Sequence, residues 1–553
     1  MEMDAGSVDE LPYNGSMKEL TIGENKIVIS KIKNEYFSMA GLCSHYNAPL
    51  VKGVLSKSGT LVCPFHGACF DVTTGAIEDG PACDSLPTYP VRVENGRLMV
   101  KVTEAQLTVK KLSPIPKVVK HCGAQKTVVI VGGGEGGAVC AESLRRYGFN
   151  GKVIVLSKEP YLPIDRPKLS KGLGVDAAKI ALRDDAFYKS NKIDIRLGQE
   201  VKSMDLGAKQ VILSTSETIS YDYVVVATGS VPKKIPIPGA DAKNVFTLRS
   251  VSDAQSIEAA LSGSQASKKK VVLVGAGFVG LELASVLGKT ADVTVVAPEK
   301  VLFEPVLGKE MGRFLLRLHE SQGIKFKLGN GVKSFNVTDS LVTSITTNSG
   351  ESVPADLVII GIGAGPVTTM VPPELLLPNK SISVTAELQS LFDSSVYAIG
   401  DIATFPYHAS ASVESPWMMR IEHVSVAQNH GRLAAKNIVA EISGQPLERF
   451  VTTPYFWTAQ GGKSIRYAGV VPPDYGFDEV VVQGDVDGDL DKISFAVFYG
   501  RLNKVVAVGS VGRDPVVSKC ASLWKANVPI PSIEELQKGA DVLSVEEPNF
   551  NHL

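Results

Sequence analysis

Two mixed pairs of cysteine and histidine lie close together near the start of this 553-residue chain. Cys43 and His45 belong to the segment CSHYNAPL, and Cys63 and His66 belong to the segment CPFHGACFD. The chain has only seven cysteines and eight histidines in all, so these two pairs stand out. Because thiolates and imidazoles both bind metals, the pattern predicts a metal centre held by two neighbouring loops.

Two kinds of metal centre take two cysteines and two histidines. A structural zinc ion usually binds a pair of cysteines and then a pair of histidines along the chain. A Rieske [2Fe–2S] cluster has two thiolates on one iron and two imidazoles on the other, so each loop supplies one Cys and one His. The pattern C-x-H followed by C-x-x-H favours the cluster, with zinc as the alternative. Cys69 and Cys83 lack ligand spacing and are expected to be packing residues.

A glycine-rich loop follows the apolar segment Thr127–Val131. Gly132, Gly134 and Gly137 form G-x-G-x-x-G between a predicted strand and a predicted helix, and Glu159 ends the next predicted strand. In a dinucleotide-binding fold these glycines allow the tight turn, the approach of the pyrophosphate and the packing of helix on strand. The acid at the second strand end binds a ribose hydroxyl. We therefore expect a dinucleotide here.

The same pattern recurs downstream at Gly275, Gly277 and Gly280, after the apolar segment KKVVLV. At the end of the following predicted strand the usual acid is replaced by alanine, with Glu299 two residues later and a lysine next to it. An acid favours the free 2′-hydroxyl of NAD, whereas a cation favours the 2′-phosphate of NADP. The sequence therefore predicts a nicotinamide dinucleotide, NADH or NADPH, without choosing between them.

The order of strand and helix patterns predicts a multidomain chain. It predicts a small all-β unit, then two interleaved α/β Rossmann-like dinucleotide-binding domains, then an α+β C-terminal domain whose last helix lies near Ile533–Lys538. The expected boundaries are 17–105 for the β domain, 106–125 for a linker, 126–248 with 372–445 for a discontinuous FAD domain, 249–371 for the NAD(P) domain, and 449–545 for the C-terminal domain.

Three further segments resemble one branch of the two-dinucleotide-fold flavoprotein reductases. EPYLPIDRPKLSK (Glu159–Lys171), RIEHVSVAQNHGR (Arg420–Arg432) and PYFWTAQ (Pro454–Gln460) are similar to hallmarks of the apoptosis-inducing-factor and ferredoxin-reductase branch. The resemblance covers the chain from about Thr127 onward and implies FAD in the first fold and NAD(P)H in the second.

This resemblance also implies roles for residues outside the glycine loops. Lys171, Glu282 and His423 are expected to be catalytic, with Glu282 on the nicotinamide side. The expected flavin contacts are Arg166, Lys171, Ala227, Thr228, Gly229, Asp401 and Trp457.

Residue chemistry leaves alternatives open for some of these roles. Trp457 is compatible with a core aromatic residue, and Arg166 and Lys171 are compatible with a solvated surface pair. Glu282 is harder to explain as packing, because an unpaired buried carboxylate is costly.

One feature of disulfide reductases is missing. Those members of the superfamily carry a redox-active cysteine pair soon after the first glycine loop, but no cysteine lies between Glu159 and Lys192. Cys140 has no partner at short spacing and is expected to be a packing residue. The electrons on a flavin therefore need another exit, and the N-terminal cluster is a candidate.

The N-terminal loops resemble those of Rieske ferredoxins from aromatic-ring dioxygenase systems. Respiratory Rieske loops carry an additional disulfide and hydroxyl groups near the cluster sulfurs; here Ala48 and Phe65 replace the cysteines, and Ala68 and Phe70 replace the hydroxyl residues. Because hydrogen bonds to sulfur raise the potential, we expect a potential at the low end of the Rieske range, roughly −150 mV.

These observations predict an NAD(P)H-dependent oxidoreductase that passes electrons through FAD to the cluster and on to an unknown one-electron acceptor. The whole chain resembles the Rieske-containing, apoptosis-inducing-factor-like family. An alternative from another class is a signalling or cell-death protein whose cofactors control conformation instead of turnover. A third alternative keeps the reductase and makes the β unit a zinc-stabilised docking module.

The bulk composition narrows the expected partners and location. The net charge of −1 gives no reason to expect nucleic acid as a partner. The most apolar stretches, such as Val271–Gly288, are interrupted and too short to span a bilayer. The acidic N-terminal sequence resembles no secretory signal, so a cytoplasmic location is expected, with mitochondria as the alternative. A homodimer is possible in this superfamily, but no feature of the sequence requires one.

Overall fold

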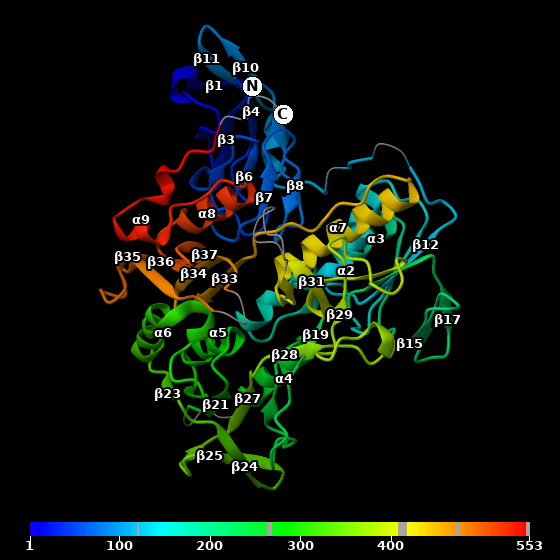
Figure 1. The fold of residues 1–553 in the computed structure, drawn as a ribbon, viewed down its shortest axis with the longest axis vertical. Coiled ribbons are helices and arrows are strands. Elements are labelled where there is room, and N and C mark those ends of the chain that lie inside the picture. Colours follow the sequence, from blue (N-terminus) through cyan, green and yellow to red (C-terminus); the bar gives the residue numbers. More distant parts are fainter. Residues whose placement is uncertain (115, 119–120, 263–267, 408–416, 472–475, 549–553) are drawn as a thin grey trace.

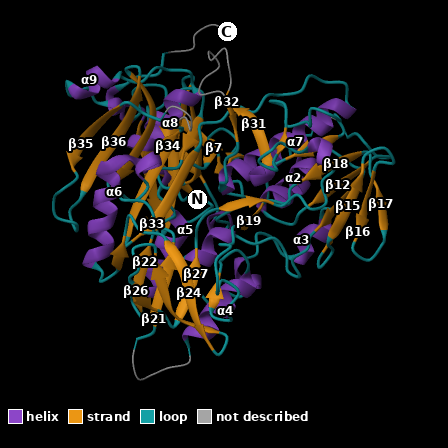
Figure 2. Cartoon of the chain, turned by 60° about the horizontal axis from the view of Figure 1, so that its bottom comes forward, coloured by secondary structure: helices purple, strands orange, loops and turns teal. Residues whose placement is uncertain are grey.

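A computed structural model describes the chain except residues 115, 119–120, 263–267, 408–416, 472–475 and 549–553. Figure 1 shows the N-terminal unit above the C-terminal sheet and the first α/β unit, with the second α/β unit at the opposite end. Figure 2 shows strands and helices from a second direction. No helix of the described residues is long and apolar enough to cross a membrane.

The N-terminal unit consists of three antiparallel sheets. Alternation builds their core: in the strand Arg97–Lys101, Leu98 and Val100 are fully buried, whereas Met99 between them is half-buried and both end residues are exposed. The sheets have the strand orders β1 (Glu2–Ser7), β11 (Arg97–Lys101), β10 (Val91–Glu94); β2 (Met17–Ile22), β3 (Asn25–Ile32), β4 (Glu35–Ala40), β9 (Thr88–Tyr89); and β5 (Val54–Leu55), β6 (Thr60–Val62), β7 (Cys69–Asp71), β8 (Ile77–Asp79).

The first α/β unit is built on a parallel sheet whose strands are almost continuously apolar, as expected for strands covered on both faces. The order is β14 (Ile193–Arg196), β13 (Lys152–Leu156), β12 (Thr127–Val131), β18 (Tyr223–Val226), β30 (Val396–Ala398). Helix α2 (Glu135–Arg146) follows the first glycine loop and packs along α7 (Val424–Ile442). Helix α3 (Asp185–Ser190) precedes β14, and the meander β15 (Val201–Asp205), β16 (Gln210–Leu213), β17 (Thr218–Ser220) extends the unit.

The second α/β unit repeats this architecture. Its parallel sheet has the order β20 (Val245–Phe246), β27 (Leu357–Ile360), β21 (Lys270–Val274), β22 (Asp292–Val296), β23 (Lys325–Lys327). Its helices are α4 (Val251–Leu261), α5 (Phe278–Leu287) and α6 (Glu304–Ser321), and it carries the meander β24 (Val332–Thr338), β25 (Leu341–Thr347), β26 (Ser352–Pro354). The two units are joined by the antiparallel pair β19 (Ser230–Pro232) and β28 (Ala364–Pro366). A small sheet in the chain that returns to the first unit is formed by β29 (Ile382–Ser383), β31 (Ala403–Tyr407) and β32 (Trp417–Met419).

The C-terminal segment forms a five-stranded antiparallel sheet with its own helices on one side and α5 and α6 of the second α/β unit on the other. The order is β33 (Tyr455–Gln460), β34 (Lys463–Gly469), β37 (Lys504–Val511), β36 (Ser494–Arg501), β35 (Glu479–Asp485). Helix α9 (Ile533–Gln537) lies where a helix was predicted. Helix α8 (Val516–Lys525) was not predicted, although its residues Val517, Cys520 and Leu523 are buried against the sheet.

The structure corrects the predicted boundaries at three places. Strand β1 pairs with β11, so the N-terminal unit begins at Glu2 and not at residue 17. Strand β20 pairs with β27, so the second α/β unit includes residues 245–246, which were assigned to the first. The predicted linker begins inside the short helix α1 (Glu104–Thr108), and backbone hydrogen bonds of Leu112 and Cys122 tie it to both neighbouring units.

Candidate functional site

The two Cys/His loops of the N-terminal unit have the same backbone design. In each loop the cysteine N–H donates to the carbonyl oxygen five residues later, from Cys43 to Ala48 at 2.9 Å and from Cys63 to Ala68 at 2.8 Å. This shared turn brings the four predicted ligands together. The Nδ1 atoms of His45 and His66 are 3.1 Å apart, and the thiols of Cys43 and Cys63 interact with each other.

The four predicted ligands therefore lie as a thiol pair and an imidazole pair. Burial lowers the pKa of His45 to about 4 and that of His66 to about 2, so both rings are neutral near pH 7 and free to bind a metal. Among the described residues, no group of three or more His, Cys, Asp or Glu is arranged to hold a single metal ion. A two-iron cluster with one like pair on each iron fits this donor set.

The surroundings of the loops carry the predicted apolar residues. Ala48, Ala68 and Phe70 are buried in the core of the unit. Phe65 lies beneath the guanidinium group of Arg466, whose carbon is 5.0 Å from the ring centroid. The side chains at these four positions contain no hydroxyl group, as the expectation of a low potential requires.

Both glycine loops line one cavity of about 1430 Å³ between the two α/β units. The first loop leaves room for a ligand: a Cβ atom on Gly134 would meet no atom within 4 Å. Its other glycines are needed for packing, because a Cβ on Gly132 would lie 2.2 Å from the oxygen of Ala227 and one on Gly137 would lie 2.1 Å from the oxygen of Gly132. The cradle fits a dinucleotide whose pyrophosphate lies at the start of α2.

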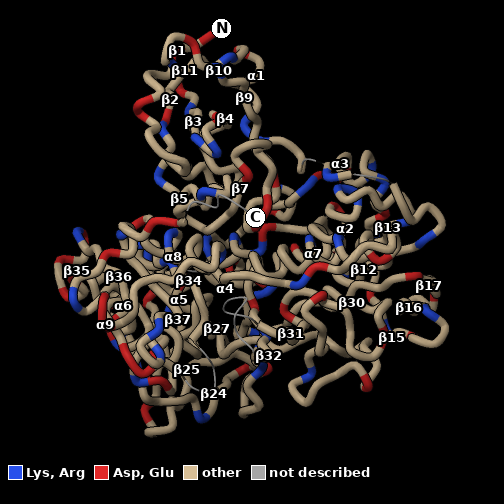
Figure 3. The backbone as a smooth tube through the Cα atoms, turned by 45° about the horizontal axis from the view of Figure 1, so that its top comes forward, with Lys and Arg blue, Asp and Glu red and all other residues tan. Residues whose placement is uncertain are grey.

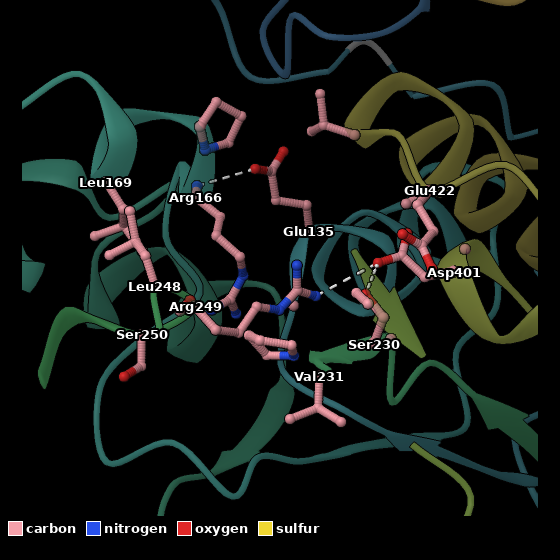
Figure 4. A pocket seen from close by; sticks show the side chains of 18 of the residues that line it. Glu135, Arg166, Leu169, Ser230, Val231, Leu248, Arg249, Ser250, Asp401 and Glu422 are labelled. Carbon is pink, nitrogen blue, oxygen red and sulfur yellow. Dashed lines mark hydrogen bonds and ion pairs between the residues drawn. The ribbon is translucent and has the colours of Figure 1, made fainter. Parts of the chain in front are cut away.

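Charged side chains line the part of the cavity drawn in Figure 4. Arg166 donates two hydrogen bonds to Glu159, at 2.9 and 3.0 Å, so the predicted ribose-binding acid is already paired with a predicted flavin contact. Asp401 accepts a hydrogen bond from Ser230 at 2.7 Å and lies 3.4 Å from the guanidinium group of Arg249. Ala227, Thr228 and Gly229 form the connection between β18 and β19 and also line the cavity.

Lys171 and Glu282 form an ion pair at 3.1 Å where the two α/β units meet the C-terminal sheet. Glu282 lies on α5 and is 7% exposed. It also accepts hydrogen bonds from Thr458 at 2.8 Å and from Ser170. The buried carboxylate therefore has the partners that its burial requires, and it fixes the ammonium group of Lys171 at the cavity wall.

Trp457 lies between the cavity and the Cys/His loops. It lines the cavity, and its ring centroid is 4.4 Å from that of His66, 5.8 Å from that of His45 and 5.2 Å from that of His423. Burial lowers the pKa of His423 to about 4, so this imidazole is neutral near pH 7. The indole ring of Trp457 thus lies between the imidazoles of His45 and His66 and the cofactor cavity.

The second glycine loop and Glu299 are placed differently. Gly275, Gly277 and Gly280 line the cavity, whereas Glu299 is exposed and does not line it. Phe278, the first residue of α5, stacks on Phe303 with 4.2 Å between ring centroids.

Sequence reasoning missed several residues at this site. Tyr46 stacks on His45, Glu135 begins α2 inside the cavity, and Thr458 and Ser170 bind Glu282. Each is a sequence neighbour of a predicted residue, but no spacing rule separates such neighbours from packing residues.

Comparisons with known proteins agree with this geometry. The chain matches the family model of pyridine nucleotide-disulphide oxidoreductases over residues 126–431 and that of the Rieske [2Fe-2S] domain over residues 1–90. It is 34% identical to apoptosis-inducing factor 3 of Homo sapiens over 519 residues, which covers 92% of this chain and 82% of that protein.

Reductases are also among the similar proteins. Rhodocoxin reductase of Rhodococcus erythropolis is 32% identical over 391 residues, which covers 70% of this chain and 86% of that protein. The crystal structure of the covalent putidaredoxin reductase–putidaredoxin complex has a chain that aligns with a TM-score of 0.68 at 27% identity, covering 76% of this chain and 97% of that chain.

Proposed function

Because the chain belongs to the pyridine nucleotide-disulphide oxidoreductase family and carries a Rieske domain, we propose that it passes electrons from NAD(P)H through FAD to the Rieske cluster and on to an external one-electron acceptor. The chain is a ferredoxin-reductase-like flavoprotein oxidoreductase, and its cofactors are FAD, a Rieske [2Fe–2S] cluster and a nicotinamide dinucleotide. When bound, FAD accepts a hydride and releases its electrons singly, which suits a one-electron cluster.

The position of Trp457 is the observation that carries this proposal. Its ring contacts His66 on one side and lines the cofactor cavity on the other, so one side chain bridges the two redox sites. Under this proposal the Rieske domain has its imidazole ligands, His45 and His66, towards the reductase within the same chain. Fusion makes the effective concentration of the two redox units high and independent of the protein concentration.

The remaining site residues receive roles under this proposal. The first glycine loop, Asp401 and the pair of Arg166 with Glu159 would hold FAD. Gly275, Gly277 and Gly280 would hold the nicotinamide dinucleotide, and Lys171, fixed by Glu282, would face the reacting rings together with His423. The antiparallel C-terminal sheet would act as the support on which Trp457 meets the Rieske domain.

One experiment tests the relay. NADH or NADPH is added anaerobically to the purified holoprotein, and the flavin absorbance and the cluster signal in electron paramagnetic resonance (EPR) are followed together. We expect the flavin to bleach and the cluster signal to appear. The variant Cys43→Ser should lose the cluster signal and keep flavin reduction. A flavin that is reduced while an intact cluster stays oxidised would contradict the relay and favour cofactors that control conformation instead.

A further inference from the structure

Buried contacts fix the Rieske domain on the reductase. The guanidinium group of Arg183 binds Asp84 of the Rieske domain at 2.6 Å and Glu142 of α2 at 3.0 Å, and all three side chains are largely buried. Arg432 of α7 donates to the carbonyl oxygen of Ala82 at 2.9 Å. Lifting the domain off would break these charge-assisted hydrogen bonds, so they stabilise the docked position. We take the docked position as the one from which the cluster delivers electrons.

The second ligand loop is covered by the C-terminal unit in this position. A Cβ on Gly67 would lie 2.6 Å from the ring of Tyr455, whose hydroxyl group is 3.4 Å from the oxygen of Pro64. Ser518 of α8 donates to the oxygen of Cys63, and Arg466 donates to the oxygen of Phe65. These contacts cover the second ligand loop, and His66 in this loop contacts Trp457, which lines the cofactor cavity.

The first ligand loop carries a partly exposed tyrosine. Tyr46 is 36% exposed and stacks on His45, with 3.9 Å between ring centroids and 14° between ring planes. It also meets His66 edge-on at 5.4 Å. The two imidazoles thus have Trp457 as their contact towards the cavity and Tyr46 as an aromatic contact that reaches solvent.

Two residues of the reductase hold the Tyr46 ring in place. Its hydroxyl group donates to Asp165 at 2.7 Å, and the ammonium group of Lys168 lies 5.5 Å from the ring centroid. Tyr46 lines neither the cofactor cavity nor the smaller cavity at the domain interface. His45 and Lys168 flank the ring, and the part of Tyr46 that stays exposed outside these cavities is open to contact with the surface of another protein.

We propose that Tyr46 is the exit point, where electrons pass from His45 to a one-electron carrier protein at the outer surface. This inference rests on the proposed function. In each transfer the reduced cluster loses one electron and the carrier gains one, and no bond is made. Two transfers balance one NAD(P)H, which yields NAD(P)⁺, one proton and two reduced carriers. The phenol remains un-oxidised and serves as the medium between the ligand and the carrier.

Two matched variants test the proposal. Tyr46→Phe keeps the stacked ring and removes the hydrogen bond to Asp165, whereas Tyr46→Leu keeps His45 covered but removes the ring. The cluster is reduced with limiting dithionite, without NAD(P)H, and its reoxidation by oxidised cytochrome c, the probe carrier, is followed by rapid mixing. Cys43→Ser protein provides the blank for electrons that leave the flavin directly. The EPR spectrum and midpoint potential of the cluster are measured in each variant.

We expect reoxidation to be normal in Tyr46→Phe and several-fold slower in Tyr46→Leu, by more than the measured change in midpoint potential accounts for, with NADH-driven cluster reduction no slower than in the parent. Equal reoxidation rates in Tyr46→Leu and the parent would overturn the proposal, because electrons would then leave elsewhere. Slower NADH-driven cluster reduction in Tyr46→Leu would also overturn it, because the ring would then serve the entry side. Failure of the relay itself would appear separately, as a cluster that NADH does not reduce in the parent protein.

Discussion

Glu135 is a buried carboxyl group at the first position of α2, on the wall of the cofactor cavity. Gln428 donates to it at 2.7 Å and the N–H of Arg166 at 3.2 Å, while the guanidinium group of Arg166 is committed to Glu159. Burial, and then the negative charge of Asp165, raise the pKa of Glu135 to about 7. The folded protein therefore holds a proton that the unfolded chain releases at lower pH.

This shift predicts a stability that falls as pH rises. The pKa of Glu135 is higher in the folded protein than in the unfolded chain. The protonated carboxyl group therefore stabilises the folded state fully below the unfolded pKa, and this stabilisation is lost as pH rises through about 7. Glu135→Gln should remove this pH-dependent decrease in the free energy of unfolding, which amounts to roughly 3 kcal/mol at most. Melting temperatures of the holoprotein at mildly acidic and mildly alkaline pH should differ less in this variant than in the parent.

A matched control for this prediction is Glu104→Gln, which changes the exposed first residue of α1. Its melting temperatures should follow those of the parent at both pH values. If Glu135→Gln shows the same pH dependence as the parent, Glu135 is already ionised in the folded protein.

Gly67 combines a left-handed backbone with a close contact across the domain interface. Its φ is +73°, and a Cβ would lie 2.6 Å from the ring of Tyr455. Gly96, in the turn between β10 and β11, has φ of +75° and open space around it. Both alanine variants should lose about 1–2 kcal/mol from backbone strain, and Gly67→Ala should lose more because the Tyr455 contact is displaced.

Thermal unfolding and the iron content of the purified protein measure this difference. Gly96→Ala should keep a full cluster, whereas Gly67→Ala should lose part of it because the ligand loop shifts. Equal losses of stability in the two variants would mean that Tyr455 moves aside without cost and that the interface is soft at this point.

At the scale of elements, the helices and loops around Arg183 decide how firmly the Rieske domain is held. The side chain of Arg183 is 10% exposed and neutralises Asp84 and Glu142 together. Arg196 also binds two carboxylates, those of Asp194 and Glu217, but its side chain is 33% exposed. Arg183 and Arg196 thus each bind two carboxylates, the first at a buried interface and the second at the surface.

Arg183→Met should loosen the docked domain far more than Arg196→Met. The buried variant leaves two carboxylates with less compensation and is expected to cost about 3–5 kcal/mol, whereas the surface variant should cost about 1 kcal/mol or less. Hydrogen exchange of β7 and β8, and proteolysis near residues 106–125, report the loosening. Unchanged exchange in Arg183→Met would show that Arg432 and the C-terminal unit hold the domain without Arg183.

The sequence predicted those elements that follow local rules. The two glycine loops and the close approach of the two Cys/His loops were predictable because each depends on residue type at short spacing. Strand β1 and helix α8 were missed because pairing partners far along the chain stabilise them. The ion pair of Lys171 with Glu282, and the contact of Trp457 with His66, depend on how whole units meet, which no local pattern encodes.

At the scale of the whole molecule, the Rieske unit lies against the ferredoxin-reductase-like part of the same chain. Charges of both signs are interspersed over the backbone tube in Figure 3, in line with the net charge of −1. The contacts that hold the Rieske domain include the buried ion pair of Arg183 with Asp84 and hydrogen bonds to backbone oxygens, beside the more exposed ion pair of Lys525 with Asp79. Long-range attraction between oppositely charged surfaces is therefore not needed to bring the two redox units together.

This arrangement predicts that NADH-driven cluster reduction is independent of protein concentration and nearly independent of salt. Raising the ionic strength from about 0.1 M to about 1 M shortens the screening length from about 10 Å to about 3 Å, which weakens surface attraction but affects buried pairs little. The rate is measured by rapid mixing after NADH has reduced the flavin. Reoxidation by cytochrome c, a bimolecular step, serves as the internal control, since it should slow as the carrier is diluted and respond to salt. A cluster-reduction rate that falls on dilution or with added salt would mean that the domains separate and meet again in each turnover.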